Sequence, residues 1–403
     1  MVKKKSSGPK SKSSKPAIQA TTASPPAAKP EAPSRVEDHK QQQTLLNIFA
    51  DAFGGVLARS DYTSLLQEVK QALYDRAFER AFAREDFLEV YAARWSPTRA
   101  LCYARVLGGI SRYLDGLVAG AVAVNPREEE GEDADADGDG DGDGDGDGDG
   151  DRDRVDRDRR PGLRMLRMLA IGGGAAETAA FGAYLRGVSD ELTGNLTLLD
   201  TGPWQSVVSK LHTGLTTAPQ LSKYASAKAQ AGNAPFIASA RLRSTFVQQD
   251  VLELDREGLS GLLSEGQGEG QGEPLLVTLL FTLNELYTTG GIGKTTALLR
   301  NLSAAVPLGS LLLVVDSPGS YSEAAVGREA RRYPMQWLLD HTLLQNSSEH
   351  LPPEGCCRWE KLESHDSVWF RLDEGRLRYP IALENMRYQM HLYRACAPPR
   401  PSD

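Results

Sequence analysis

Three consecutive glycines between an apolar run and a helix-forming run are the feature of this chain best suited to hold a ligand. Within RMLAIGGGAAETAAFGAYL the apolar run ends at Ile171, and the glycine turn consists of Gly172, Gly173 and Gly174. Glycine lets the backbone turn tightly and approach a ligand closely, and the helix that follows adds free amides and a partial positive charge. Such a turn favours a nucleotide-like ligand at the carboxyl edge of a parallel sheet. The dinucleotide fingerprint G-x-G-x-x-G is not met, because its sixth position is Glu177.

Two aspartates end the next two apolar runs in chain order. NLTLLD ends in Asp200, 28 residues after Gly172, and STFVQQD ends in Asp250. A carboxylate at the tip of the second strand can accept hydrogen bonds from both hydroxyls of a ribose, and one after the third strand can accept from an adenine amino group. Either aspartate alone could be a helix N-cap. Both together, in order after the glycine turn, favour a nucleoside ligand.

The stretch TTGGIGKTTALL resembles a phosphate-binding loop of the pattern G-x-x-x-x-G-K-[ST]. Gly293, Lys294 and Thr295 match the pattern, but Thr288 stands at the position of the first glycine. The preceding connection, NELYTTG, is longer and more polar than a tight phosphate loop. A P-loop NTPase that uses Lys294 and Thr295 is therefore an alternative, and the preferred interpretation is a loop leading into a helix.

No metal site is expected. The histidines have no metal-ligand spacing with the four cysteines, which show neither C-x-x-C spacing nor a disulfide framework. The repeated Asp-Gly pairs imitate an EF-hand loop from Asp135, but Gly146 occupies position 12, where a bidentate glutamate is needed. We expect this repeat to be solvated chain.

Seven short apolar runs would position these candidate residues. They cover 166–172, 195–200, 244–250, 273–282, 310–319, 367–372 and 386–394. The first five alternate with crossover segments, which predicts a parallel sheet covered by helices, and the last two lie close together like an antiparallel pair. The predicted fold class is α/β.

The remaining chain divides into one helical region and two polar tracts. Residues 41–126 carry apolar residues at spacings of three and four and are predicted to form an N-terminal helical subdomain. Residues 1–40 form a basic tail and residues 127–161 an acidic Asp-Gly-rich insertion, both too polar to bury a core and expected to be disordered. Residues 162–397 hold the predicted sheet.

The formal net charge of −8 comes from the acidic insertion, since the chain outside it is close to neutral. We expect neither a membrane-spanning segment nor a secretory signal, because no apolar run approaches ~20 residues and the first residues lack an apolar core. The cluster Lys3, Lys4 and Lys5 is typical of nuclear-import and nucleic-acid-binding tails. The expected location is the nucleus (nucleolus), with the cytoplasm as a second location.

Several segments together resemble the fungal 25S ribosomal RNA uridine-N3 methyltransferases, which are class I S-adenosylmethionine-dependent enzymes. The segments are LAIGGGAAE, LLFTLNELY, GKTTALLRNL, LLLVVDSPGSYSE and YPIALENMRYQMHLYRA. The resemblance covers most of 163–396 and extends to the helices from about residue 42. It implies a seven-stranded Rossmann-like methyltransferase sheet whose last two strands form an antiparallel hairpin.

The resemblance also implies a cofactor and its site. S-adenosyl-L-methionine would be held by Ile171 and the glycine turn at its methionine end, by Asp200 at its ribose and by Asp250 at its adenine. Two positions depart from the usual pattern, because Ala170 replaces an acid and Ala176 replaces a glycine. A catalytically inactive methyltransferase-like ribosome-assembly factor is therefore a further alternative.

The tip of the fourth strand faces the transferred methyl group in this fold, and here it reads FTLNELY. Asn284, Glu285 and Tyr287 would be catalytic: the amide hydrogen-bonds the base edge, the carboxylate removes the N3 proton of uridine and the ring stacks on the base. Asn284 and Glu285 could instead cap the next helix. The implied partner is large-subunit ribosomal RNA or a pre-ribosomal particle, with no membrane association and a monomeric enzyme.

Overall fold

The computed structural model describes most of the chain outside the two polar tracts. It describes residues 33–119, 164–264, 272–319, 321–326, 329–344, 356–373 and 375–398. The predicted acidic insertion at 127–161 lies outside these residues, and so does the predicted tail up to residue 32. Residues 33–40 belong to a helix, so the predicted boundary of the tail at residue 40 is wrong.

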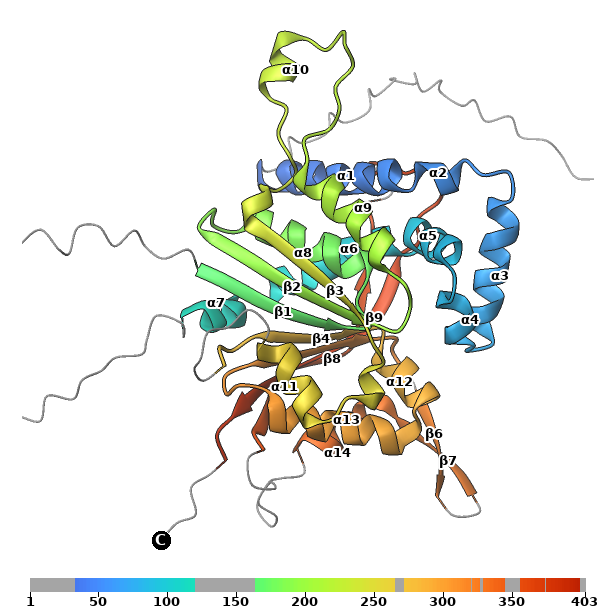
Figure 1. Cartoon of the computed structure of the whole chain (residues 1–403), viewed down its shortest axis with the longest axis vertical. Coiled ribbons are helices and arrows are strands. Elements are labelled where there is room, and N and C mark those ends of the chain that lie inside the picture. Colours follow the sequence, from blue (N-terminus) through green and yellow to red (C-terminus); the bar gives the residue numbers. More distant parts are fainter. Residues whose placement is uncertain are drawn as a thin grey trace, which may run out of the picture.

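A seven-stranded sheet forms the centre of the molecule, in the order β3-β2-β1-β4-β5-β9-β8 (Figure 1). Its strands are β1 (Arg164–Ile171), β2 (Leu192–Asp200), β3 (Leu242–Gln248), β4 (Leu276–Leu280), β5 (Leu311–Asp316), β8 (Arg358–Phe370) and β9 (Met386–Cys396). The first five are mutually parallel, and β9 is antiparallel to both of its neighbours. The predicted α/β class and the closing antiparallel hairpin are confirmed.

Strand composition explains this arrangement. Every residue of β4 and β5 is buried, and both strands consist almost wholly of leucine and valine, as expected for parallel strands covered on both faces. The chain leaves β1 in one direction to make β2 and β3 and returns to the other side of β1 to make β4. The carboxyl ends of β1 and β4 therefore meet where the strand order reverses, which is where open α/β sheets bind ligands.

Helices cover both faces of the sheet. The helices that follow strands are α8 (Ala175–Gly187), α9 (Gln205–Thr216), α10 (Ala227–Ala231), α11 (Arg256–Ser264), α12 (Leu283–Thr289), α13 (Gly291–Ala305) and α14 (Met335–Leu344), with 3₁₀ turns at Ser239–Arg241 and Val251–Glu253. Helices α8 and α9 pack into the hydrophobic core on one face, and α11 to α14 into the core on the other. None of the described helices is long and apolar enough to cross a bilayer.

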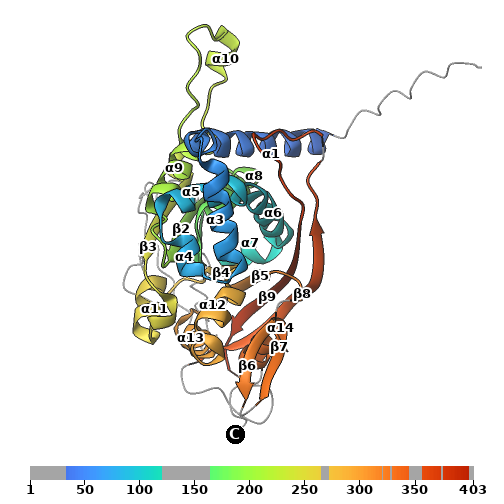
Figure 2. The same cartoon turned by 90° about the vertical axis from the view of Figure 1, so that its right-hand side faces the viewer.

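The N-terminal helices are part of the first of these cores. They are α1 (Pro33–Ala52), α2 (Gly54–Leu57), α3 (Tyr62–Tyr74), α4 (Phe78–Phe82), α5 (Glu85–Arg94), α6 (Ser96–Gly109) and α7 (Ser111–Ala119). Their buried side chains, such as Phe49 and Tyr103, belong to the same cluster as Phe181 of α8 and Leu211 of α9. Figure 2 shows α3 to α6 lying in front of the sheet. This region is therefore a layer of the fold with no separate core of its own.

The segment between the last two strands of the sheet contacts the N-terminal helices. The segment between β8 and β9, here called the strap (residues 371–373 and 375–385), runs up beside α1 (Figure 2). The Gln43 side chain donates to the Arg378 carbonyl and accepts from the Arg378 N–H, at 2.9 and 2.8 Å. Tyr379 donates to the Ala93 carbonyl at 2.9 Å, and Arg94 pairs with Glu384. The strap thus fastens α1 and α5 to the last two strands of the sheet.

A short hairpin follows β5 and was not predicted. It consists of β6 (Tyr321–Val326) and β7 (Glu329–Pro334), which pair antiparallel and form a separate two-stranded sheet. The apolar runs used to find strands stop at residue 319, and the hairpin strands are too polar to show in such a search.

Candidate functional site

The glycine turn lies directly after β1, at the point where the strand order reverses. Gly172 has φ of +68° and its N–H donates to the Leu199 carbonyl at 2.8 Å. A Cβ atom at this position would lie 2.3 Å from Thr282 Oγ1. The turn therefore needs glycine both for its left-handed backbone and for the space beside Thr282.

The third glycine begins helix α8 and its amide is bound by a side chain. The N–H of Gly174 donates to Glu177 Oε2 at 2.8 Å, and a Cβ atom on Gly174 would lie 3.0 Å from the Trp204 ring. Burial raises the pKa of Glu177 to about 7, against the lowering effect of that amide. Sequence reasoning missed Glu177 as a site residue; the available signal was an acid in the first turn of the helix.

A small cavity, here called the cofactor cavity, lies above the glycine turn. Its walls come from the turn, from β2 and β4 and from the N-terminal helices. The lining residues are Phe82, Tyr91, Ser96, Arg99, Gly172, Gly174, Ala175, Ala176, Glu177, Asp200, Trp204, Leu280, Phe281, Thr282 and Glu285. It encloses only about 30 Å³, room for little more than a water molecule. A ligand larger than this can enter only if residues of the lining move apart.

Asp200 lines the cofactor cavity from the end of β2. Its Oδ1 accepts from the Gly202 N–H at 2.7 Å, which holds the carboxylate at the sheet edge. Burial raises the pKa of Asp200 to about 6, and hydrogen bonds from Gly202 and Trp204 oppose the rise. The structure thus brings Asp200 together with Gly172 and Gly174, as the sequence predicted.

A second cavity, here called the acceptor cavity, adjoins the first. It encloses about 180 Å³ and is lined by Leu73, Phe78, Tyr91, Trp95, Arg99, Phe281, Asn284, Glu285, Asp316 and Ser317. Four of these residues also line the cofactor cavity: Tyr91, Arg99, Phe281 and Glu285. The two cavities therefore meet at these four side chains, and molecules in them would be neighbours.

Glu285 is the carboxylate that belongs to both cavities. It lies in the first turn of α12, immediately after β4. Burial raises the pKa of Glu285 to about 8; Arg99 lowers the pKa, and the acids Asp200, Asp316 and Glu177 raise it further. A carboxyl group with this pKa can exchange a proton with a weak acid near neutral pH, which is what a general base for a ring N–H requires.

Asp316 at the end of β5 holds the start of α12 in place. Its Oδ2 accepts from the Asn284 N–H at 3.0 Å and its Oδ1 from the Ser317 N–H at 2.7 Å. Burial raises the pKa of Asp316 to about 6, and these two amides oppose the rise. Because both oxygens bind backbone amides, Asp316 fixes the start of α12 and leaves Glu285 as the better base.

Arg99 is the cation that faces these carboxylates, and sequence reasoning missed it because it comes from the N-terminal helix α6. Its guanidinium carbon lies 4.8 Å from the centre of the Phe281 ring and 5.2 Å from that of Tyr91, whose hydroxyl accepts a hydrogen bond from it. Rings on two sides hold the group between the two cavities. It could bind a carboxylate in one cavity or negative charge on a base in the other.

Phe281 occupies a strained position in the shared wall. Its φ is +60°, a value that non-glycine residues seldom adopt, and its N–H donates to the Val315 carbonyl at 2.7 Å. Such strain persists where the surrounding structure imposes it, and it concentrates at functional sites. Here it turns the chain sharply from β4 into α12 and places Glu285 and Asn284 at the cavities.

Several predicted site residues lie elsewhere. Tyr287 is buried in the core under α13 and α14, because two residues after Glu285 a helix has turned about 200°; its predicted stacking on a base is wrong. Ile171 and Gly173 line neither cavity, and a Cβ on Gly173 would meet Ala170 at 2.6 Å. Asp250 also lines neither cavity: its Oδ1 caps the following 3₁₀ turn by accepting from the Leu252 N–H at 2.9 Å. An adenine contact by Asp250 stays a prediction.

The P-loop alternative is wrong. Helix α12 separates β4 from the glycines at 290–293, so no loop runs directly from the strand to a phosphate. Lys294 is an exposed residue of α13 whose Nζ lies 2.6 Å from Glu253 Oε1, and Thr295 is buried. In the part of the chain that the structure describes, no group of histidines, cysteines and acids could hold a metal ion.

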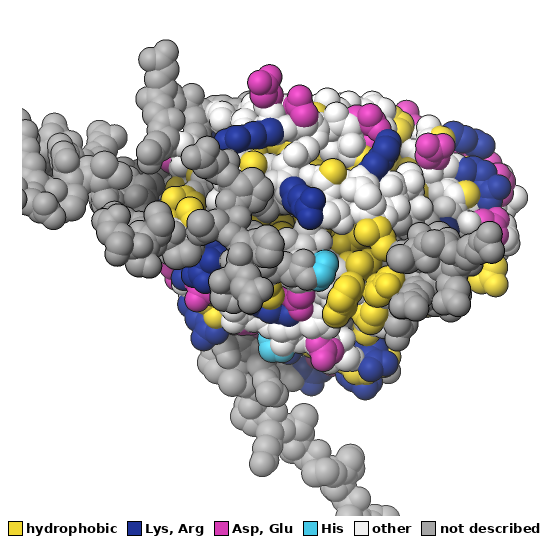
Figure 3. All heavy atoms as spheres, turned by 90° about the horizontal axis from the view of Figure 1, so that it is seen from below, with side chains coloured by type: hydrophobic (Ala, Val, Ile, Leu, Met, Phe, Trp, Pro, Cys, Tyr) yellow, Lys and Arg dark blue, Asp and Glu magenta, His cyan; other side chains and the backbone are white. Residues whose placement is uncertain are grey.

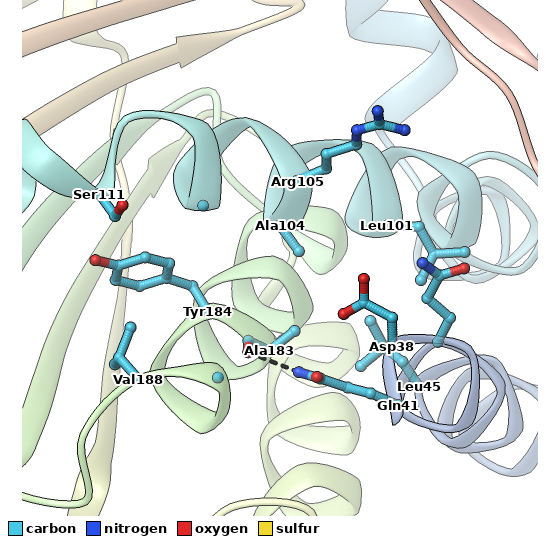
Figure 4. Close-up of a pocket in the computed structure, with 13 residues that line it drawn as sticks. Asp38, Gln41, Leu45, Leu101, Ala104, Arg105, Ser111, Ala183, Tyr184 and Val188 are labelled. Atoms are coloured by element: carbon cyan, nitrogen blue, oxygen red, sulfur yellow. Dashed lines mark hydrogen bonds between the residues drawn. The ribbon is translucent and has the colours of Figure 1, made fainter. Parts of the chain in front are cut away.

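A larger cavity lies away from the glycine turn. It encloses about 610 Å³ between α1, α6 and the end of α8, and Gln41 crosses it to donate to the Ala183 carbonyl at 2.9 Å (Figure 4). Tyr184 and Val188 line it about 14 Å or more along α8 from the turn. No predicted site residue lines this cavity, so its size does not make it the candidate site.

The four acids of the site give stability a definite dependence on pH. Burial raises the pKa values of Glu177, Asp200, Glu285 and Asp316 to about 7, 6, 8 and 6. The folded state therefore binds more protons than the unfolded state, whose carboxyls titrate near pH 4, and stability falls as pH rises through these folded pKa values. We expect the thermal midpoint to drop by several degrees between pH 6 and pH 8.5, because each kcal/mol lost from the free energy of unfolding lowers the midpoint by about 2–4 °C.

Thermal unfolding across this pH range checks the expectation, and Glu177→Gln is the matched variant. Glutamine keeps an oxygen for the Gly174 N–H but cannot ionise, so the decline with pH should become shallower. A thermal midpoint that rises from pH 6 to pH 8.5 would contradict the assignment.

Comparison with known proteins agrees with this geometry. Residues 49–394 match the model of a protein family described as "Putative SAM-dependent methyltransferase". A protein of Saccharomyces cerevisiae named 25S rRNA (uridine(2843)-N(3))-methyltransferase is 27% identical over 358 residues, which cover 83% of this chain and 78% of that protein.

Two solved structures illustrate the structural likeness. An O-methyltransferase family protein from Burkholderia thailandensis matches with a TM-score of 0.32 and 11% identity, over 84% of this chain and 74% of that one. A SAM-dependent methyltransferase from Methanosarcina mazei matches with a TM-score of 0.30 and 8% identity, over 57% and 92%. The assignment of the fold rests on the strand order and not on these low scores.

Proposed function

The chain belongs to this family of S-adenosylmethionine-dependent methyltransferases, and from that premise we propose that it methylates N3 of a uridine in large-subunit ribosomal RNA. The observation that carries the proposal is the wall of four side chains shared by the cofactor cavity and the acceptor cavity. The yeast relative named for this reaction supports the choice of substrate.

The residues of the cofactor cavity suit S-adenosylmethionine. Gly172 and Gly174 leave the backbone open to close approach, and Asp200 offers an acceptor for ribose hydroxyls. Arg99 would bind the carboxylate of the methionine end, and Glu177 and Glu285 offer carboxyl oxygens beside a positive sulfur. When bound, S-adenosylmethionine supplies a methyl group activated by the positive charge on that sulfur.

The acceptor cavity suits a single uracil ring. Phe78, Tyr91, Trp95 and Phe281 surround it with aromatic surface, on which an extruded base can stack. N3 lies on the Watson–Crick edge of uridine, so the base must be unpaired before it can react. A cavity of about 180 Å³ has room for one pyrimidine ring.

Proton transfer is the task of Glu285. Its carboxylate takes the N3 proton, and the raised pKa brings its basicity closer to that of the weakly acidic uridine N–H. The Arg99 guanidinium, held between Tyr91 and Phe281, stabilises the negative charge that then spreads over the uracil oxygens. Asn284 lies beside Glu285 in the same cavity and can donate an amide hydrogen to one of those oxygens.

Product identification tests the proposal. The purified protein, radiolabelled methyl donor and deproteinised large-subunit ribosomal RNA are incubated, and the nucleosides are then separated. We expect label in N3-methyluridine, and none when small-subunit RNA replaces the substrate. Label in a different nucleoside would overturn the uridine assignment.

We propose that the reaction occurs in the nucleolus, because the basic cluster at Lys3–Lys5 is typical of nuclear-import tails.

A further inference from the structure

An exposed tryptophan between two arginines lies at the end of β8. Trp369 is 52% exposed, and its ring centre lies 5.1 Å from the guanidinium carbon of Arg371 and 5.8 Å from that of Arg387. These three residues are here called the Trp369 platform. A large aromatic side chain left in water, with two arginines beside its ring, has no role in the hydrophobic cores described above.

The Trp369 platform lies on the same sheet edge as the acceptor cavity. Trp369 is paired with Arg387 across the hairpin, and Gln389, two residues along β9, is paired with Asp316 of β5. Gln389 donates to the Ser317 carbonyl at 2.7 Å, and both Asp316 and Ser317 line the acceptor cavity. Two residues of a strand span about 7 Å and point the same way, and β5 and β8 lie two strand spacings apart, so the platform lies roughly 12 Å from Asp316 along the same sheet edge.

The two arginines have no carboxylate partner among the described residues. Arg387 donates from Nε to Ser367 Oγ at 2.6 Å, which orients its guanidinium, and the guanidinium of Arg371 lies over the Trp369 ring. Other surface arginines such as Arg59, Arg84 and Arg241 are paired with aspartates. Uncompensated guanidinium groups beside an aromatic face suit a ligand that carries both phosphates and flat rings.

We propose that the Trp369 platform binds single-stranded RNA next to the uridine that enters the acceptor cavity. One base stacks on Trp369, and Arg371 and Arg387 contact the phosphates on either side of it. The inference rests on the proposed function. It explains how a protein whose folded part has almost no net charge can bind RNA. RNA is favoured over a protein partner because two guanidinium groups without a carboxylate partner among the described residues suit phosphates.

The chain offers a matched control for the test. Trp337 of α14 is 48% exposed, close to the value for Trp369, but its ring stacks between Tyr333 and His341 at 5.2 and 4.8 Å. Figure 3 shows hydrophobic side chains gathered on the face seen from below, the side on which α14 lies. No arginine is stacked on Trp337 in the described structure.

The experiment measures binding of a short labelled oligouridylate by fluorescence anisotropy, without methyl donor. We expect Trp369→Ala to weaken binding roughly tenfold to a hundredfold, Trp369→Phe to restore most of the affinity and Trp337→Ala to leave it unchanged. Arg387→Ala should reduce the slope of log affinity against log salt by about 0.7 for the lost phosphate contact.

Unchanged RNA affinity in Trp369→Ala would overturn the inference, and so would an equal loss in Trp337→Ala. Folding of each variant is monitored by thermal unfolding. If Trp369→Ala is unfolded, the other two variants test the inference. It requires that Trp369→Phe still binds RNA and that Arg387→Ala lowers the slope of log affinity against log salt. The binding assay uses no methyl donor. A protein that binds RNA through the platform but makes no N3-methyluridine would therefore contradict the proposed function alone.

Discussion

Replacing Glu285 with glutamine is expected to slow methyl transfer by about 10²–10⁴-fold, the usual contribution of a positioned general base. Glutamine has nearly the same shape, so both cavities keep their walls, but it cannot take the N3 proton of uridine. Affinity for S-adenosylmethionine, measured by calorimetry, should change only a few fold. Glu253→Gln is the matched control, because Glu253 is exposed and lines neither cavity.

The pH dependence gives a second measurement of the same assignment. With a pKa of about 8, Glu285 is mostly protonated at pH 7 and becomes competent as the pH rises. The wild-type kcat/KM should therefore increase from pH 6.5 to about pH 8.5, and the profile of Glu285→Gln should lack this limb. If Glu285→Gln keeps wild-type rates while Asp316→Asn loses them, the base is Asp316 and our assignment is wrong.

Replacing Gly172 with alanine is expected to abolish cofactor binding, with a loss of at least about a hundredfold, or ~2.7 kcal/mol. The new Cβ would lie 2.3 Å from Thr282 Oγ1, and the left-handed φ adds a further penalty of about 1–2 kcal/mol. Thr282 must move, and it forms part of the cofactor cavity wall. Calorimetric titration with S-adenosylmethionine measures the effect.

Gly291→Ala separates backbone strain from the steric clash. Gly291 also has a left-handed φ, of +67°, but a Cβ there meets nothing within 4 Å, and the residue lines neither cavity. This variant should lose some thermal stability and keep its affinity for S-adenosylmethionine. Equal loss of affinity in both variants would show that the glycine turn does not act by close approach to the ligand.

The part of the site on the sheet could be predicted because parallel strands deliver their carboxyl ends to one edge. Gly172, Asp200 and Glu285 follow three different strands, and the structure brings all three to one cavity. Distance from the strand tip does not decide alone, because Glu285 lies five residues past the end of β4 and still lines the cavity; the turn or helix after the strand sets where each side chain lies. Asp250 lies two residues past the end of β3 and caps a 3₁₀ turn, and Tyr287 lies on the far side of α12.

The other half of the site comes from the N-terminal helices and could not be predicted. Tyr91, Trp95 and Arg99 belong to amphipathic helices whose periodicity identifies a buried face but not the surface on which that face packs. Their placement over the sheet edge depends on tertiary contacts with α8 and α9. Arg99 on a largely apolar helix was the only local sign that this face meets carboxylates as well as hydrocarbon.

The strap between β8 and β9 affects the order in which the parts of the proposed site form during synthesis. A ribosome makes α5 and α6 early and the strap about 280 residues later, yet Tyr379 and Glu384 fasten Ala93 and Arg94 in place. Until the strap emerges, the helix that carries Tyr91 lacks these two contacts, although the glycine turn and the packing against α8 and α9 can already form. The contacts at Ala93 and Arg94 can therefore form only after all the strands up to β8 have been made, so the helical wall of the proposed site gains its last fastening late in the synthesis of the described residues.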